Sequence, residues 1–308
     1  MKKQLFFQSA VISTILSYLV IFAGGLVRVS GAGMGCPDWP RCFGRWIPPT
    51  NIDQIPSHID ATSFNIVLAW TEYSNRLIGV SAGFSIIILN IIAIFYFRKE
   101  LKLLSAAVLS LILVGANGGL GALVVSSVLD PFLVSLHMIL ALILVSVLSY
   151  ACIESYKGIH LEQFKDIEIN RTLSNSLIVF WILIVIEILL GTGIRTNLEF
   201  VSIENPLLSK GELLNALDSY KYLHSILGFS LLFLSIYIYL KLRNYKLYIV
   251  RFLGTFTLAM IIVQIFLGEM MIFFELPQLT RLFHTWGSSW LVGIIIILYN
   301  CISNEYVK

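Results

Sequence analysis

Eight long apolar segments restrict what this chain can fold into. An α-helix needs about 20 predominantly apolar residues to cross the hydrocarbon core of a bilayer, and each segment is long enough. Only 13% of the 308 residues are charged, whereas soluble domains have about 25%. The sequence therefore predicts an all-α integral membrane protein with eight transmembrane helices. The segments cover roughly residues 5–27, 70–97, 103–126, 132–153, 174–194, 221–241, 249–273 and 279–302.

The first apolar segment follows Lys2 and Lys3, an arrangement that a cleaved signal peptide would share. It is longer than the apolar part of most signal peptides, and it continues into GGLVRVSG (24–31) without a cleavage pattern of small residues. We therefore expect an uncleaved transmembrane helix here.

The distribution of basic residues predicts which side of the cell membrane each connection occupies. Cytoplasmic connections carry an excess of Lys and Arg, and 13 of the 21 basic residues lie at the termini and in three connections. Both termini are therefore predicted to be cytoplasmic, and segments 28–69 and 195–220 to lie outside. No basic stripe indicates nucleic-acid binding. The 13 residues are Lys2, Lys3, Arg98, Lys99, Lys102, Lys157, Lys165, Arg171, Lys241, Arg243, Lys246, Arg251 and Lys308.

Two of the four cysteines lie in the first predicted outer segment, in GCPDWPRC (35–42). An oxidising outer compartment permits a disulfide between Cys36 and Cys42; the alternative is two free thiols. Cys152 and Cys301 fall near predicted cytoplasmic helix ends, where we expect reduced packing residues.

The two halves of the sequence resemble each other, as in a duplicated membrane fold. They predict two four-helix bundles related by a pseudo-twofold axis along the membrane normal: an N-terminal half at 1–156, a cytoplasmic linker at 157–173 and a C-terminal half at 174–308. Four strings recur in order: GGLVRVS (24–30) matches GTGIRTN (191–197), NRLIG (75–79) matches HSILG (224–228), NGGLG (117–121) matches QIFLG (264–268), and SLHMI (135–139) matches LFHTW (282–286).

The repeat brings four side chains to one depth in the membrane. Asn75 and His137 in the first half correspond to His224 and His284 in the second. At 1.5 Å per helical residue, all four lie within about 10 Å of the outer surface. Two imidazoles from two helices of a bundle suit the two faces of a heme iron. Hydrogen-bonding or packing histidines are the alternative, and zinc or copper is less favoured because no third ligand is near.

Several charged residues also lie within or beside the membrane segments, where they are costly and often functional. Glu72 and Asn75 share a helix face at i,i+3 spacing. Glu269 is a proton relay or the partner of an arginine, and Glu187 has no assigned role beyond a satisfied buried acid. Four arginines near outer helix ends either bind heme propionates or reach the membrane surface: Arg28, Arg76, Arg195 and Arg281.

The sequence resembles the heme A synthase family over nearly its whole length. The most specific strings are GGLVRVSGAGMGCPDWPRCFG (24–44) and EYSNRLIG (72–79), together with the histidines at 137, 224 and 284. The resemblance implies an eight-helix membrane protein that oxidises a methyl group of heme O to a formyl group, through an alcohol. The product, heme A, serves terminal oxidases. Expected partners are heme O synthase and terminal oxidase assembly, with membrane lipid around the helices and a homo-oligomer possible.

The resemblance also implies roles for particular residues. His224 and His284 would be the axial ligands of a heme b cofactor, and His137 would be the histidine of the substrate-heme site. Glu72 matches the acidic residue required for oxidation, and Cys36 and Cys42 match the outer cysteine pair.

Two departures from the family pattern stand out. Many members have a histidine at the position of Asn75, and some have a second cysteine pair in the segment that corresponds to 195–220. Because an amide is a poor iron ligand, we expect Asn75 to support the substrate site by hydrogen bonds, with His137 as its one strong ligand and Arg76 and Arg28 nearby. Competing interpretations are a diheme b-type, quinol-linked electron-transfer protein and a transporter with parallel repeats.

Overall fold

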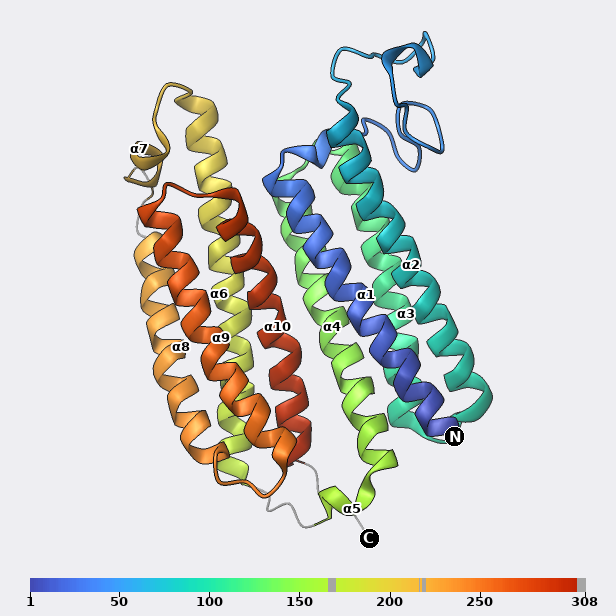
Figure 1. Ribbon diagram of the computed structural model, residues 1–308, viewed down its shortest axis with the longest axis vertical. Coiled ribbons are helices and arrows are strands. Elements are labelled where there is room, and N and C mark those ends of the chain that lie inside the picture. Colours follow the sequence, from blue (N-terminus) through green and yellow to red (C-terminus); the bar gives the residue numbers. More distant parts are fainter. Residues whose placement is uncertain (166–169, 216, 218–219, 304–308) are drawn as a thin grey trace. The chain divides into compact units, whose positions relative to one another are not determined.

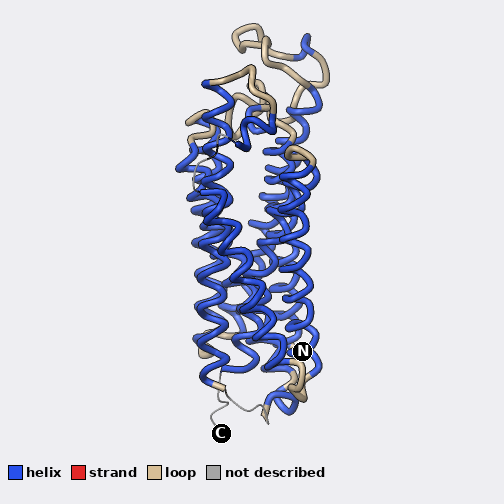
Figure 2. The backbone as a smooth tube through the Cα atoms, turned by 90° about the vertical axis from the view of Figure 1, so that its left-hand side faces the viewer, coloured by secondary structure: helices blue, strands red, loops and turns tan. Residues whose placement is uncertain are grey.

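The structure is a computed structural model that describes residues 1–165, 170–215, 217 and 220–303. Its described part is helical and contains no β-strand, and eight helices are long and apolar enough to cross a membrane. Both findings confirm the predicted class. Parts of the predicted linker (166–169) and of the second outer segment (216 and 218–219), and also Lys308, lie outside the described residues. Figure 2 shows that the loops are confined to the helix ends.

The chain divides into two compact units, Met1–Ala151 and Cys152–Lys308. In the first unit, α1 packs along α2, which also packs on α3. The fourth helix, α4, lies against α3 where the backbone of His137 meets the side-chain amide of Asn117. The helices of this unit are α1 (Lys2–Val29), α2 (Ile66–Tyr96), α3 (Leu101–Ser126) and α4 (Pro131–Ile159), whose last turns belong to the second unit (Figure 1).

In the second unit, α6 and α9 each pack against both α8 and α10. The end of α4 is joined to α10 by the buried Lys157, whose ammonium donates to the backbone carbonyl of Asn300 at 2.8 Å. The remaining helices are α5 (Leu161–Phe164), α6 (Arg171–Glu204), α7 (Lys210–Asn215), α8 (Tyr220–Leu242), α9 (Tyr248–Phe273) and α10 (Gln278–Ser303).

Two helices begin with asparagine caps. The side chain of Asn65 accepts hydrogen bonds from the first turn of α2, and Asn170 does so at the start of α6. Such caps satisfy backbone N–H groups that have no partner within the helix. The other end of α6 extends beyond the apolar run that ends at residue 194: the helix continues through the first part of the predicted outer loop to Glu204. Its polar extension is stabilised by the i,i+4 ion pair between Arg195 and Glu199.

The segment between α1 and α2 forms a small folded cap with two short 3₁₀ turns, Ala32–Met34 and Ile52–Gln54. Its core consists of the disulfide between Cys36 and Cys42, Phe43, and Ala69 from the first turn of α2. Ile55, Ile59, Phe64 and Tyr73 pack against this core. The structure therefore contains the cysteine bridge that the sequence suggested.

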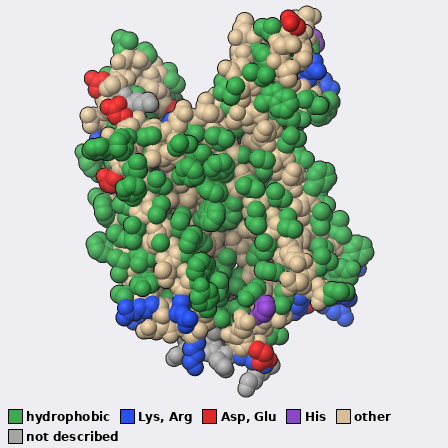
Figure 3. All heavy atoms as spheres, in the orientation of Figure 1, with side chains coloured by type: hydrophobic (Ala, Val, Ile, Leu, Met, Phe, Trp, Pro, Cys, Tyr) green, Lys and Arg blue, Asp and Glu red, His purple; other side chains and the backbone are tan. Residues whose placement is uncertain are grey.

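Apolar side chains cover the middle of the helices in each unit, whereas Lys and Arg side chains gather toward helix ends (Figure 3). Large exposed apolar residues such as Phe84, Ile112 and Phe233 are 64%, 61% and 71% exposed. In water this surface would be unfavourable, but in a bilayer it contacts lipid. The surface is thus that of a multi-pass membrane protein.

Candidate functional site

The outer end of α2 holds a buried carboxylate that anchors the cap. Glu72 is only 4% exposed. Its Oε2 accepts a hydrogen bond from the backbone N–H of Cys36 at 2.9 Å, and its Oε1 pairs with the guanidinium of Arg76. The i,i+4 spacing places both charges on one face of α2. Glu72 is therefore linked to the disulfide segment directly.

Arg76 also links α2 to the cap, through the guanidinium nitrogen that does not contact Glu72. Its Nη1 donates to the backbone carbonyl of Arg41 at 2.7 Å and to that of Asp38 at 3.0 Å. The backbone of Gly35 is also close to α2, because a Cβ at this position would lie 2.4 Å from the carbonyl oxygen of Leu68. In the structure Nη1 and Nη2 of Arg76 contact the cap and Glu72, and the expected contact of Arg76 with an acidic group of a bound heme stays a prediction.

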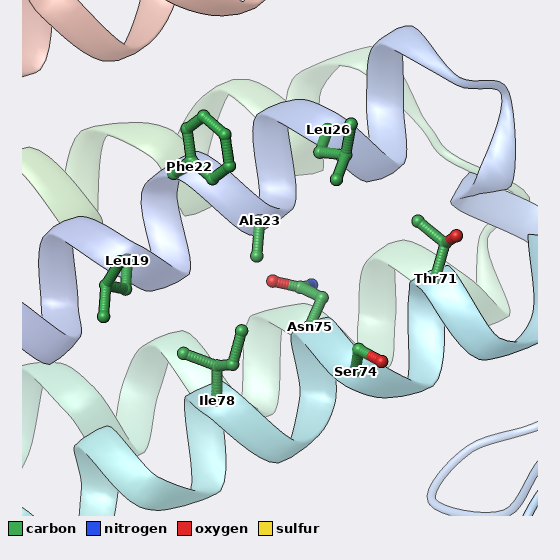
Figure 4. A pocket seen from close by; sticks show the side chains of 8 residues that line it. All are labelled: Leu19, Phe22, Ala23, Leu26, Thr71, Ser74, Asn75 and Ile78. Atoms are coloured by element: carbon green, nitrogen blue, oxygen red, sulfur yellow. The ribbon is translucent and has the colours of Figure 1, made fainter.

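The side chain of Asn75, on the same helix, points toward Ala23 of α1 (Figure 4). Its side-chain oxygen is buried and has no hydrogen-bond partner. It lies beside a pocket of about 270 Å³ between α1 and α2. The pocket is lined by Leu19, Phe22, Ala23, Leu26, Thr71, Ser74, Asn75 and Ile78. A mainly apolar pocket with one unpartnered amide oxygen can hold an apolar group that carries a single donor.

His137 lies on α4 of the same unit, facing α3. Its ring is close to Gly121, where a Cβ would approach the Cε1 atom to 3.7 Å. One turn earlier on α3, the amide of Asn117 bridges the backbone carbonyl of His137 at 2.9 Å and the N–H of Ala141 at 3.3 Å. These contacts fix the backbone that presents the imidazole.

The second unit brings its two membrane histidines together. The ring centroids of His224 on α8 and His284 on α10 are 6.2 Å apart, with an angle of 67° between the ring planes. The Nδ1 atom of His284 is buried without a hydrogen-bond partner of standard geometry. A carboxylate that the sequence left without a role adjoins the other ring, since Oε1 of Glu187 is 3.1 Å from Nδ1 of His224.

The four arginines have different surroundings. Arg76 holds the cap, and Arg195 pairs with Glu199 at 3.2 Å. Arg28 lies in the last turn of α1. Arg281 has a buried Nε without a partner, and it precedes His284 by three residues, which places both on one face of α10. Among these arginines, Arg281 offers the donor best placed for an acidic group near the histidine pair.

A glycine faces each of the four positions that the repeat aligns. A Cβ on Gly24 would lie 3.9 Å from the side-chain oxygen of Asn75, and one on Gly191 would lie 3.3 Å from Cε1 of His224. A Cβ on Gly121 would lie 3.7 Å from Cε1 of His137, and one on Gly268 would lie 3.7 Å from Cε1 of His284. These glycines stood inside the repeated strings, but their contact with the neighbouring helix could not be read from the sequence.

The spacing of the two histidine rings suits a heme iron between them. Metal–imidazole bonds are about 2.0–2.1 Å long in zinc sites, and bonds of similar length on both sides of an iron would separate the ring centroids by roughly 6 Å. The observed 6.2 Å agrees with this spacing. Zinc needs three or four protein ligands, and the described residues contain no group of three His, Cys, Asp or Glu that could hold a metal. The residues present therefore fit a heme.

Comparisons with known proteins find similar chains. The family model described as cytochrome oxidase assembly protein (COX15-CtaA) matches residues 8–296. Proteins named heme A synthase match shorter stretches: 29% identity over 136 residues in Geobacillus thermodenitrificans, 30% over 141 in Shewanella oneidensis, and 26% over 140 in Listeria monocytogenes. These matches cover 44%, 44% and 46% of this chain, and 38%, 42% and 41% of the relatives. The chain thus spans about two fifths of the length of these curated relatives.

Proposed function

Because the chain belongs to the cytochrome oxidase assembly protein family, we propose that it is a heme A synthase. It would oxidise a methyl group of heme O to a formyl group, through an alcohol, and so provide heme A for terminal oxidases. The observation that carries this proposal is the pairing of His224 with His284 at a spacing that suits a heme iron. The names of the similar proteins support the same activity.

The second unit would hold the cofactor. His224 and His284 would be the axial ligands of a heme b, and Arg281 would bind a propionate with its unpartnered Nε. Arg195 is a further candidate, since its contact with Glu199 is exposed and exchangeable. A heme with two imidazole ligands supplies electron transfer. The chain's part is to hold both imidazoles in place and to present the arginine at the propionate edge.

The first unit would hold the substrate heme, with His137 as the one strong iron ligand. Asn75 would donate or accept a hydrogen bond at the open face, where its amide oxygen has no partner. Arg28 would serve a propionate, whereas Arg76 would act through the carboxylate that it holds. A site with weak ligation on one face can admit its substrate and release its product.

Glu72 would take protons as the substrate methyl group is oxidised. Each of its carboxylate oxygens already accepts one hydrogen bond from the chain. A carboxylate oxygen has a second lone pair, so each can accept a further donor without releasing the cap. Arg76 holds the carboxylate in a fixed orientation, which a general base requires.

The location follows from the same proposal. We place the chain in the cell membrane with both termini cytoplasmic, and its two four-helix halves related by a pseudo-twofold axis along the membrane normal. Heme O synthase would supply the substrate, and terminal oxidase assembly would use the product. The excess of Lys and Arg at the termini and in the connections that follow α2, α4 and α8 supports this orientation.

The activity is tested by extracting hemes from cells that express the chain together with a heme O synthase. Chromatography should then show heme A and its alcohol precursor, which cells with an empty vector lack. Purified protein that carries two low-spin hemes and leaves heme O unchanged would instead indicate an electron-transfer protein. Purified protein without a heme absorption band would indicate a transporter.

Replacing Asn75 with histidine is expected to change the ligation of the substrate heme. Gly24 leaves room beside this position, as Gly191 does beside His224. The wild-type protein loaded with substrate heme should show one bis-histidine low-spin signal and a second heme that is five-coordinate or weakly six-coordinate. In Asn75→His both signals should be low spin by electron paramagnetic resonance. Two bis-histidine signals in the wild type would contradict the role given to Asn75.

A further inference from the structure

A carboxylate beside the histidine pair comes from the middle of α6. Oε1 of Glu187 lies 3.1 Å from Nδ1 of His224, and the side chains are 16% and 23% exposed. A carboxylate within a membrane helix is costly unless it is paired or serves a function. The basic group that it contacts is an imidazole proposed to bind iron, and this contact is therefore a candidate for function.

Two glycines make room for the contact. Gly191 lies one turn from Glu187 on the same face of α6, and the ring of His224 packs against it, with Cε1 3.3 Å from where a Cβ would lie. Gly228 lies one turn from His224 on α8, and a Cβ there would be 3.2 Å from Oε1 of Glu187. A side chain at either position would push the ring or the carboxylate aside.

The contact also decides which ring nitrogen is left for a metal. Nδ1 of His224 and Oε2 of Glu187 are both buried without a hydrogen-bond partner of standard geometry. A small rotation of either side chain, at the observed 3.1 Å, would align the N–H of Nδ1 with the carboxylate. With Nδ1 engaged in this way, Nε2 is the nitrogen free to coordinate iron.

The internal repeat provides a comparison within the chain. Counting with the offset that relates Arg28 to Arg195, the residue that corresponds to Glu187 is Val20. The first half therefore has no carboxylate at this place, and it also has Asn75 where the second half has His224. The half with the histidine also has the carboxylate, and the half without the histidine lacks it. This is expected if the carboxylate holds the histidine in position as an iron ligand.

We propose that Glu187 is a positioning residue for His224: it accepts a hydrogen bond from Nδ1 and directs Nε2 to the heme iron. This inference rests on the proposed function of the histidine pair. A carboxylate acceptor strengthens imidazole as an electron donor, which favours the ferric over the ferrous heme. Glu187 thereby sets the reduction potential of the heme as well as the orientation of its ligand.

The test is the potential and spectrum of the bound heme in full-length purified protein. Glu187→Gln should make the heme easier to reduce, because the ratio of ferric to ferrous affinity falls by about tenfold, or about 59 mV for one electron. The low-spin signal in electron paramagnetic resonance should shift in the same variant. The matched control is Glu204→Gln, which removes an exposed carboxylate from the last turn of the same helix, α6, and should leave potential and spectrum unchanged.

Gly228→Ala provides a second test if Glu187→Gln does not fold. It keeps the charge but displaces Oε1, and should shift the potential in the same direction by a smaller factor. A wild-type bis-histidine signal that neither variant alters would overturn the positioning role and leave the proposed function standing. A wild-type protein without that signal, or one that keeps it in His224→Ala, would overturn the proposed function and this inference with it.

Discussion

Replacing either His224 or His284 with alanine is expected to abolish the bis-histidine heme b signal of the purified protein. The two ring centroids are 6.2 Å apart. When one imidazole is removed, the remaining one can occupy only one face of the iron, and the second axial ligand is lost. Loss of a residue that merely supports a metal ligand weakens binding about 10–100-fold, and loss of the ligand itself should exceed that. Heme content per protein and the low-spin resonance measure the effect.

His58→Ala is the matched control, because His58 is exposed in the cap. The substitution removes the same kind of side chain and leaves the membrane histidines of both units unchanged. Its heme content should equal that of the wild type. Should both His224→Ala and His284→Ala insert normally and keep full heme b, the assignment of the ligand pair is wrong.

Glu72→Gln is expected to stop the formation of heme A while the protein keeps its heme b. General acid–base groups contribute about 10²–10⁴-fold to rates, so the yield should fall by at least about 100-fold. The glutamine oxygen can still accept the hydrogen bond from the N–H of Cys36, and the cap should therefore stay attached. Chromatography of extracted hemes measures heme O, the alcohol and heme A.

The structure makes a control necessary, because Glu72 also anchors the cap. Cys42→Ser opens the disulfide and loosens the cap without changing the carboxylate. If Glu72 acts in the chemistry, its variant should lose far more product than Cys42→Ser does. Equal losses in the two variants would mean that Glu72 matters only through the cap.

The membrane helices could be predicted from the sequence because hydropathy and length suffice for such segments. The end of α6 could not. Hydropathy falls after residue 194, yet the helix continues for ten residues through Arg195 and Glu199 to Glu204. Outside the apolar region, a helix depends on pairs between its own side chains, and hydropathy does not register them.

The candidate site was predictable in part. The internal repeat aligned His224 with Asn75 and His284 with His137, which identified the positions to compare. The contacts of Glu72 with Cys36 and of Glu187 with His224 cross 36 and 37 residues of chain, and no spacing rule within one helix reports them. Their partners become visible only when neighbouring segments are packed.

The way the cap is fastened to α2 bears on how a large lipid-soluble substrate reaches its site. Lifting the cap would break hydrogen bonds to Arg76 and Glu72, each worth about 1.5–3 kcal/mol because a charged group takes part. It would also separate the backbone of Gly35 from that of Leu68. The pocket beside Asn75 is instead bounded by α1 and α2 alone. Lateral access from the bilayer, between these two helices, leaves every one of the cap's bonds intact.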